Sequence, residues 1–294
     1  MSLKIFLHIL FLTTTTILFS CSKSQVDKSE TLVIGSFNIE WLGDGINDNI
    51  KRDESDYKRI ADLIKDCDAD ILGLQEIENV TAIKRIMKYL PDFRYIIGNT
   101  GSKQNPALIY KKDCMVEFIT NYTPLAIKSG RTRAGLIINA KKGTFDWIMM
   151  VVHLKSTSRY DSTEALRIES FEIRKRQAEI LRAWADSTAE HNEKDIIILG
   201  DFNDNPNRNK QQNMSPLTWD NKYLFLTKDE VSCANPRWDM IDHIVVNQSA
   251  SSRYLVNSLF VYNIYHSYSE SELRKVSDHC PVIASFNITM PDND

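Results

Sequence analysis

The sequence is poor in glycine and proline and has no large excess of charge of either sign. Its 294 residues contain 10 Gly and 8 Pro, and 36 basic side chains against 39 acidic ones give a formal net charge of −3. Collagen-like and low-complexity chains are much richer in glycine and proline, so those classes are excluded. A polybasic mode of nucleic-acid binding is excluded as well, although a local basic groove is not. What remains is a globular protein long enough to bury a sizeable core.

Cysteine is also scarce and irregularly spaced. Beyond residue 21 the cysteines are Cys67, Cys114, Cys233 and Cys280, and no two of them have the CxxC spacing of a zinc site. We therefore expect neither a zinc cage nor a disulfide framework. Cys67 and Cys280 lie in apolar-periodic segments, which predicts buried thiols.

Long apolar runs are absent except at the start of the chain. Residues 1–20 (MSLKIFLHILFLTTTTILFS) have one early lysine and then an apolar stretch too short for a spanning helix, the pattern of a secretory signal peptide. The segment LFSC (18–21) resembles the bacterial lipobox, in which the cysteine becomes the lipid-modified first residue. We expect a lipoprotein signal over 1–20, a lipidated Cys21 with a polar tether over 21–30, and one domain over 31–290. A secreted or periplasmic protein without the anchor is the alternative.

Residues 31–286 alternate short apolar runs with stretches of helical periodicity. Strands are predicted over residues 32–40, 71–75, 107–110, 135–139, 147–153, 196–199, 241–246 and 282–286. Helical spacing of apolar residues occurs over 57–64, 80–90 and 173–184, and we expect Arg174, Lys175 and Arg176 on the exposed face of the last helix. Continuous apolar strands mixed with helices indicate sheets with helices packed outside them.

Polar side chains stand at the ends of several predicted strands. Alternation puts Asn38 and Glu40 on one face of the first strand, and Asp201 and Asn203 share a face two residues apart. Asp242 lies within an apolar run, where a carboxylate is costly unless it is paired, and a buried histidine would offset that cost. Each residue alone is explained by a turn or a cap. Together they indicate one site at one end of a sheet, and the same strand-end position is held by Glu76, His153, Asp278 and His279.

Six segments resemble, in order, the motifs of the endonuclease/exonuclease/phosphatase superfamily. This superfamily includes deoxyribonuclease I, the exonuclease III type of abasic-site endonuclease, inositol-polyphosphate 5-phosphatases and bacterial sphingomyelinases. The segments are SFNIEWLG (36–43), ILGLQEIEN (71–79), VVHLKS (151–156), LGDFNDNP (199–206), MIDHIVV (240–246) and SDHCPV (277–282). The resemblance covers residues 31–288 and implies an α/β fold, a four-layer sandwich of two packed mixed β-sheets flanked by helices. It also implies one active site at the edge where loops of both sheets meet.

The resemblance further implies metal-dependent hydrolysis of a phosphate ester by in-line attack of an activated water. Glu76 would be the principal ligand of Mg²⁺, or alternatively Mn²⁺, with Asn38 and Asp278 beside the metal. Asp201 would orient and deprotonate the water, and Asn203 would fix the geometry of Asp201 and of the phosphate.

The histidines would act on the phosphate itself. By the same resemblance His279, held in its charged form by Asp242, would contact the scissile phosphate, and His153 would bind a phosphate oxygen from the opposite side. Glu40 is a site candidate of lower rank than the acids named above. Lys155 is either a charge that screens the phosphate or an exposed strand end. His243 is expected on the other face of its strand from Asp242, with a structural role.

The substrate is less well defined by the sequence. Arg131 and Arg133 precede one predicted strand, and Arg237 and Trp238 precede another. Arginine binds phosphate with two hydrogen bonds and tryptophan stacks on a base, so these four are candidate substrate-binding residues; solvated arginines and a packed tryptophan are the alternative.

Three functions remain open at this stage. The first is an extracytoplasmic endonuclease or exonuclease. The second is a phosphatase or phosphodiesterase of small molecules or lipid head groups, of the inositol-phosphate or sphingomyelin type. The third is an inactive binding protein on the same scaffold. In either enzymatic case the substrate is a nucleic acid or a phosphorylated small molecule, membrane contact is through the lipid anchor alone, and we expect a monomer without a protein partner.

Overall fold

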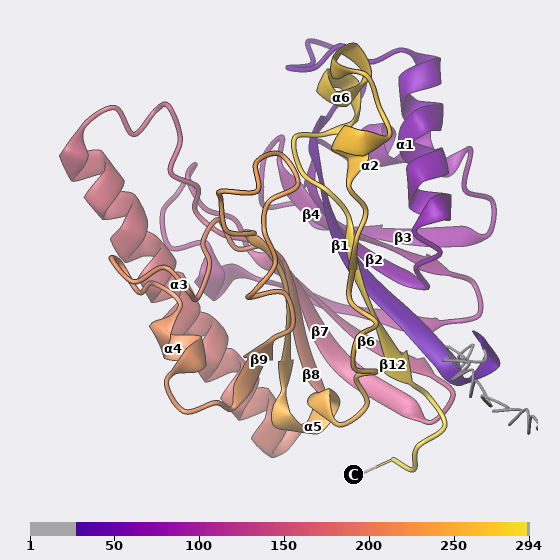
Figure 1. Cartoon of the computed structure of the whole chain (residues 1–294), viewed down its shortest axis with the longest axis vertical. Helices are drawn as coiled ribbons and strands as arrows, with labels where there is room; N and C mark the ends of the chain where they lie inside the picture. The colour runs from indigo at the N-terminus through magenta and orange to yellow at the C-terminus, as the bar shows by residue number, and fades with distance from the viewer. Residues whose placement is uncertain (1–27, 293–294) are drawn as a thin grey trace, which may run out of the picture.

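The computed structural model of the chain describes residues 28–292, which form two six-stranded mixed β-sheets that face each other (Figure 1). The signal segment and Cys21 lie outside the described residues. In the first sheet the strand order is β11-β12-β1-β2-β4-β3, with β1 (Thr31–Leu42), β2 (Ile71–Ile77), β3 (Phe93–Ile97), β4 (Asn105–Lys111), β11 (Phe260–Val261) and β12 (Val282–Asn287). In the second it is β5-β6-β7-β8-β10-β9, with β5 (Met115–Tyr122), β6 (Gly135–Lys142), β7 (Phe145–His153), β8 (Ile196–Asp201), β9 (Tyr223–Phe225) and β10 (Asp242–Asn247).

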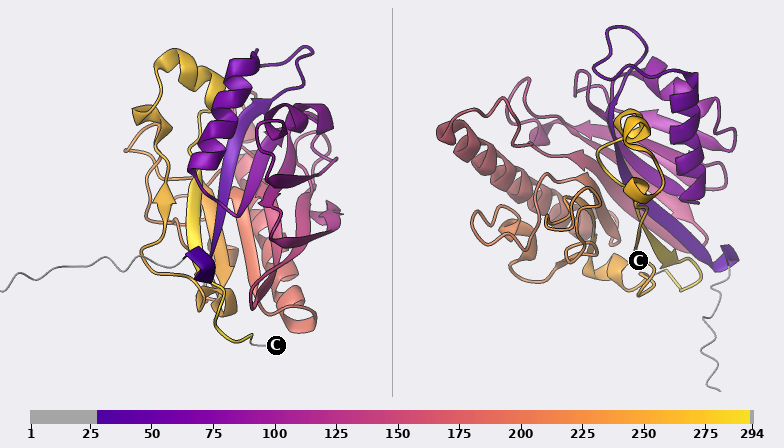
Figure 2. Two further views of the ribbon diagram at one scale, coloured as in Figure 1. Left: turned by 90° about the vertical axis from the view of Figure 1, so that its right-hand side faces the viewer. Right: turned by 45° about the horizontal axis from the view of Figure 1, so that its top comes forward.

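Helices cover the outer face of each sheet. The first sheet carries α1 (Glu54–Asp66) and α2 (Val80–Met87), and the second carries the long α3 (Glu164–His191), so that α1 and α3 lie on opposite outer sides in Figure 2. The shorter elements are η1 (Lys28–Glu30), η2 (Thr123–Leu125), α4 (Ser215–Thr218), α5 (Gln248–Ser251), η3 (Ile264–His266) and α6 (Glu270–Val276). Among the residues from 28 to 292, no helix is both long and apolar enough to cross a membrane.

Three apolar cores separate four layers. One core lies between the sheets, one lies under α1 and α2, and one lies under α3. The predicted four-layer sandwich is confirmed, and so are the predicted helices, which begin at side-chain caps. Asp53 accepts the N–H of Asp56 at the start of α1, and Asn79 accepts that of Ala82 at the start of α2.

Four strands have no counterpart among the predicted ones, and all four are edge strands. These are β3 and β11 in the first sheet and β5 and β9 in the second. In β3 and β5 nearly every side chain is partly or fully exposed, so the apolar pattern that reveals a strand is weak there.

Strand alternation carries polar side chains into the space between the sheets. In β1, Leu32 and Ile34 belong to the core between the sheets, whereas Phe37 belongs to the core under α1. The same alternation brings Asn38 to the inner face of β1 and Asp201 to the inner face of β8. The inter-sheet core therefore ends, at one edge, in polar groups from both sheets.

One disulfide joins the loops of the two sheets at this edge. It links Cys233, between β9 and β10, to Cys280, just before β12. The prediction of a free buried thiol at Cys280 is wrong, as is the expectation that no cysteines are paired, because the fold brings together two cysteines 47 residues apart. Cys67 and Cys114 are free and buried, which confirms the prediction for Cys67.

The disulfide predicts a redox-dependent stability. Breaking it with Cys233→Ala should lower the free energy of unfolding by about 2–4 kcal/mol, because the unfolded chain gains loop entropy. A reducing agent should lower the unfolding temperature of the wild type and leave that of the variant unchanged. Cys114→Ala, which removes a buried free thiol, is the matched control and should keep the response to reduction. Equal unfolding temperatures of oxidised and reduced wild type would contradict the prediction.

Candidate active site

The carboxylate of Asp201 lies at the centre of the polar edge. Its Oδ2 accepts from Asn38 Nδ2 at 3.1 Å, across the gap between the sheets, and from Asn203 Nδ2 at 3.1 Å; its Oδ1 accepts the backbone N–H of Asn203 at 2.8 Å. The Nε2 atoms of His153 and His279 lie 3.5 Å and 3.9 Å from the same Oδ2. Asp201 is only 2% exposed, so residues from both sheets enclose one buried carboxylate.

Strand pairing explains why these residues meet. Within the second sheet, Asp201 is the register partner of His153 on β7 and of Asp242 on β10, so three neighbouring strands place three polar residues in one row. Asn38 comes from the facing sheet, where Ser277 Oγ donates to its carbonyl oxygen at 2.6 Å. The polar residues predicted at the strand ends are therefore brought together by register.

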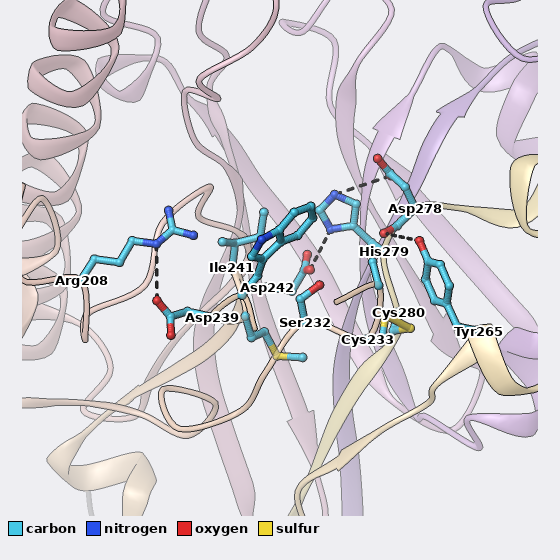
Figure 3. Close-up of a pocket in the computed structure, with 13 residues that line it drawn as sticks. Arg208, Ser232, Cys233, Asp239, Ile241, Asp242, Tyr265, Asp278, His279 and Cys280 are labelled. Atoms are coloured by element: carbon cyan, nitrogen blue, oxygen red, sulfur yellow. Dashed lines mark hydrogen bonds and ion pairs between the residues drawn. A yellow bond between two sulfur atoms is a disulfide. The ribbon is translucent and has the colours of Figure 1, made fainter. Parts of the chain in front are cut away.

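His279 is paired with Asp242 (Figure 3). The Nδ1 of His279 lies 2.7 Å from Asp242 Oδ2, while its Nε2 lies 3.7 Å from Asp278 Oδ1 on the exposed side of the loop. Burial opposes a charge on the imidazole, but the Asp242 carboxylate outweighs it and raises the pKa of His279 well above the usual value. His279 is thus a cation at neutral pH, with its Nε2 directed to the site.

Glu76 reaches the site through an irregular backbone. In a regular strand it would point outward with Leu72 and Leu74, away from the second sheet. Its φ of 65° and a register shift in β2 after Leu74 turn the carboxylate inward instead. There Oε2 accepts the N–H of Trp41 at 3.1 Å, and Oε1 lies 3.4 Å from Asn38 Nδ2.

Acidic groups accumulate beside Glu76. Burial, together with the negative charges of Asp278 and Glu76, raises the pKa of Glu40 to about 7, although Arg52 acts in the opposite direction. The backbone N–H of Glu40 donates to Asn38 Oδ1 at 3.0 Å. Glu40, ranked second by sequence, therefore stands among the acids nearest to Glu76.

Two groups of three side chains within residues 28–292 hold their potential ligand atoms within 4.8 Å of one another. They are Asp201, Asp242 and His279, and a separate cluster of Asp44, Asp48 and Glu78. In the first group, Asp242 and His279 already bind each other as a charged pair. That group is therefore better explained by the His279–Asp242 ion pair than as a metal cage.

His153 and Arg133 form the opposite wall. Burial, and then the charges of Arg133 and His279, lower the pKa of His153 well below the usual value, so this imidazole is neutral at pH 7. Arg133 donates to the His153 carbonyl at 3.3 Å and to Gln104 Oε1 at 3.1 Å, both uncharged acceptors. Gln104 was not predicted, because it lies in a loop distant in sequence.

Two cavities adjoin the site. One of about 330 Å³ lies on the His279 side and is lined by Trp238 and Tyr265 among others (Figure 3). The other, of about 800 Å³, is lined by Glu76 and by Arg131, Arg133 and Lys155. Of the four candidate substrate-binding residues, three thus line a cavity, whereas Arg237 is exposed and lines neither of them.

Lys155 is not an exposed strand end. It is 5% exposed, and its Nζ lies 3.2 Å from Oδ2 of Asp161, a side chain that is fully buried. Asp161 also pairs with Arg131 and accepts the N–H of Ser158 at 2.9 Å. No pattern in the sequence marks Asp161, since it lies in a loop without periodicity.

Arg174 corrects a second expectation. It is 1% exposed rather than solvated, and it donates to Asp204 Oδ2 at 3.1 Å and to the Lys155 carbonyl at 2.7 Å. Its spacing from Gln177 and Leu181 on the buried face of α3 is the signal that would have revealed this. Arg174 ties the loop after β7 to the loop after β8.

His243 has the structural role predicted for it. It is fully buried, its Nδ1 lies 2.6 Å from Thr227 Oγ1, and its Nε2 lies 2.9 Å from the Asp204 carbonyl. Burial lowers the pKa of His243 to about 4, so the ring is neutral.

Asp161→Asn should lower the free energy of unfolding at pH 7, and its deficit should shrink in acid. Burial alone would raise the pKa of Asp161, but the Ser158 N–H and the cations of Lys155 and Arg131 bring it down to about 2. Because the unfolded value is about 3.9, the wild type gains stability above that pH and loses it as the pH falls toward 2.

Urea unfolding at pH 7, 4 and about 2.5 measures this effect. Asp92→Asn, which changes an exposed acid, is the control and should match the wild type throughout. A deficit for Asp161→Asn that stays constant across the series would show that the carboxylate charge is not what stabilises the loop.

Comparisons with known proteins agree with this geometry. The chain matches the sequence model of the Endonuclease/Exonuclease/phosphatase family over residues 35–279. No match is found among curated proteins.

Solved structures with a similar fold include three that cover most of the chain. Truncated Caenorhabditis elegans TDP2 is 17% identical with a TM-score of 0.62, covering 87% of this chain and 98% of its own. D. rerio TDP2 complexed with single strand DNA product is 16% identical with a TM-score of 0.62, covering 87% and 99%. The Bacteroides thetaiotaomicron mannosyl-6-phosphatase Bt3783 is 16% identical with a TM-score of 0.57, covering 86% and 98%.

These identities are low, so the structures speak to the fold alone. The family match is broader evidence, because it spans most of the sandwich and includes every strand-end residue from Asn38 to His279. The chain belongs to the Endonuclease/Exonuclease/phosphatase family, whose members are generally hydrolases of phosphate esters.

Proposed function

We propose that the chain is a divalent-metal-dependent phosphodiesterase that acts outside the cytoplasm as an endonuclease or exonuclease. The observation that carries this proposal is the environment of Asp201. Burial raises the pKa of Asp201 to about 7 against the opposing charge of His279, and a pKa near the working pH suits a general base. The amides of Asn38 and Asn203 hold the carboxylate in place.

The donors around Glu76 fit a hard divalent cation such as Mg²⁺ or Mn²⁺. Glu76, Glu40 and Asp278 offer carboxylate oxygens, the ligand these ions prefer, and the Asn38 amide lies beside Glu76. Burial, and then repulsion from Asp278 and Glu76, raises the pKa of Glu40, and a cation would relieve the repulsion. Glu76 would be the main ligand, with Asn38 and Asp278 beside it. When bound, the cation supplies charge neutralisation for the phosphate and a more acidic water.

The remaining residues divide the reaction between them. Asp201 accepts the proton of the attacking water. The His279 cation, oriented by Asp242, contacts the scissile phosphate, where it stabilises the developing negative charge or donates a proton to the leaving oxygen. Neutral His153 binds a phosphate oxygen from the other side.

Two independent observations support the proposed location outside the cytoplasm. Residues 1–20 have the signal-peptide pattern, with Cys21 at the expected lipidation position. The Cys233–Cys280 disulfide supports an oxidising compartment, where such bonds persist. We infer a lipid-anchored protein at the bacterial envelope, with secretion as the alternative.

A second function is favoured by the charge of the chain. A net charge of −3 provides little long-range attraction for nucleic acid, which suits a phosphatase or phosphodiesterase of small molecules. Among proteins of similar fold, the D. rerio TDP2 structure contains a single strand DNA product, and Bt3783 is described as a mannosyl-6-phosphatase. Both functions use the same reaction centre and differ in the surrounding cavities.

The reaction centre is tested by Asp201→Ala and His279→Ala. Each should lower Mg²⁺-dependent hydrolysis by at least about 10²-fold, because each removes a proton-transfer or charge-stabilising group, while the protein stays folded. His191→Ala, at an exposed histidine on α3, is the control and should retain activity. Near wild-type rates in either site variant would disprove the assigned roles, and hydrolysis that survives chelation would disprove the metal requirement.

The substrate is tested by one panel on the purified protein with Mg²⁺ or Mn²⁺. Plasmid DNA, RNA, inositol phosphates and sphingomyelin are the substrates. Plasmid nicking that falls steeply with added salt supports the nuclease. Phosphate release from a small ester, with the plasmid untouched, supports the alternative and rejects the nuclease.

A further inference from the structure

The two cavities beside the reaction centre differ in chemistry. The lining of the cavity next to His279 contains aromatic and apolar groups, among them Trp238, Met240 and Tyr265. It also contains the acids Asp239, Asp242 and Asp278, the last of which Figure 3 shows beside Tyr265. The cavity next to Glu76 is lined on one side by four cations, which we call the cationic wall: Arg131, Arg133, Lys155 and Arg159. A substrate with its scissile phosphate at the reaction centre would extend into both.

Two members of the cationic wall are fixed in place by one buried acid. Asp161 pairs with Arg131 through Oδ1 and with Lys155 through Oδ2, and its side chain is fully buried. One carboxylate thus orients two cations, which leaves an excess of positive charge. Arg131 is also 3.2 Å from Glu169, but that acid is shared with Lys128 on the outer side of the loop.

The other two members have no acidic partner in the described part of the chain. Arg133 is largely enclosed and donates only to the uncharged acceptors His153 O and Gln104 Oε1. Arg159 is exposed, and its guanidinium contacts only the neighbouring Tyr160. A cation as enclosed as Arg133 is costly without a directly paired counter-charge, so an anion in this cavity would stabilise it.

Glu76, which lines the same cavity, and Asp201 favour the charged form of Arg133 against the effect of burial, but neither forms an ion pair with it. Glu40 and Glu76 stand on the metal side of the cavity, where their charge is directed to the proposed cation. If these cations served only to hold the loop at 155–161 in place, Arg131 and Lys155 would be sufficient. Arg133 and Arg159 remain unexplained by that purpose.

We propose that the cationic wall is a subsite for a second phosphate of the substrate, next to the scissile one. The substrate class this implies is a nucleic-acid strand, in which every internal phosphodiester has a phosphate neighbour. The inference rests on the proposed function, since it places the scissile phosphate at Asp201 and Glu76. It also explains how a slightly acidic protein binds a polyanion through a local, fixed set of cations.

The test compares three thymidine dinucleotides that carry a phosphate at the 5′ end, at the 3′ end, or at neither. KM is measured during Mg²⁺-dependent hydrolysis, and Kd is measured by calorimetry in the presence of a chelator. In the wild type one terminal phosphate should lower both constants roughly tenfold relative to the unphosphorylated dinucleotide, with kcat nearly unchanged. Equal constants for all three dinucleotides would overturn the proposal.

Variants assign the effect to the wall. Arg159→Gln removes an exposed cation without a tertiary ion pair, so the fold is kept, and it should reduce the tenfold preference. Arg131→Gln should reduce it further, and Arg131→Lys should restore part of it. Arg176→Gln, on the exposed face of α3, is the control and should retain the full preference. An unchanged preference in both glutamine variants would overturn the assignment.

The two measurements separate this inference from the function it rests on. Tighter binding of a phosphorylated dinucleotide without any hydrolysis would support the subsite and reject the phosphodiesterase. Hydrolysis of all three dinucleotides with equal KM would support the phosphodiesterase and reject the subsite. A parallel comparison of inositol monophosphate with inositol bisphosphate tests whether the second phosphate belongs to a small phosphorylated ring. A lower KM for the bisphosphate, with equal KM for the three dinucleotides, would overturn the nucleic-acid assignment.

Discussion

The hydrogen bond between Asn38 and Asp201 is the contact on which the geometry of the site depends, because it crosses from one sheet to the other. A carboxylate as buried as that of Asp201 costs several kcal/mol unless donors surround it. One sheet supplies Asn38, and the other supplies Asn203 and His153. The two sheets must therefore pack against each other in one relative position, and the apolar core between them fixes that position.

The site also uses backbone conformations that the rest of the sandwich must stabilise. Glu40, Trp41, Glu76 and Asn203 all have φ between 48° and 65°, a region that costs non-glycine residues about 1–3 kcal/mol each. Glu40 and Glu76 thereby bring their carboxylates toward the proposed metal position, and the backbone N–H of Asn203 donates back to Asp201. Three apolar cores and the Arg174 contacts between loops support this strain, so the stability of the layers and the geometry of the site are linked.

Sequence reasoning succeeded where structure follows from local periodicity. The polar residues at the predicted strand ends, among them Asn38, Asp201 and Asp242, indicated one site at one end of a sheet, and continuous apolar runs gave the central strands. It failed where contacts are distant or the backbone is irregular. The Cys233–Cys280 bond joins different sheets, and the inward turn of Glu76 depends on a φ that residue type does not reveal. The edge strands escaped because their exposed faces carry little apolar pattern.

The distribution of charge matters more for binding than its sum. At −3 the protein has little long-range field for a polyanion, yet one cavity beside the site gathers two acids and four cations in its lining. The acids concentrate at Glu76 and Glu40, where a divalent cation would neutralise the local charge. The cations concentrate around Asp161 and Arg133, enclosed enough to be weakly screened by salt. With the cation bound, the acids would no longer repel a phosphate that the cations attract, which makes affinity depend on metal loading rather than on net charge.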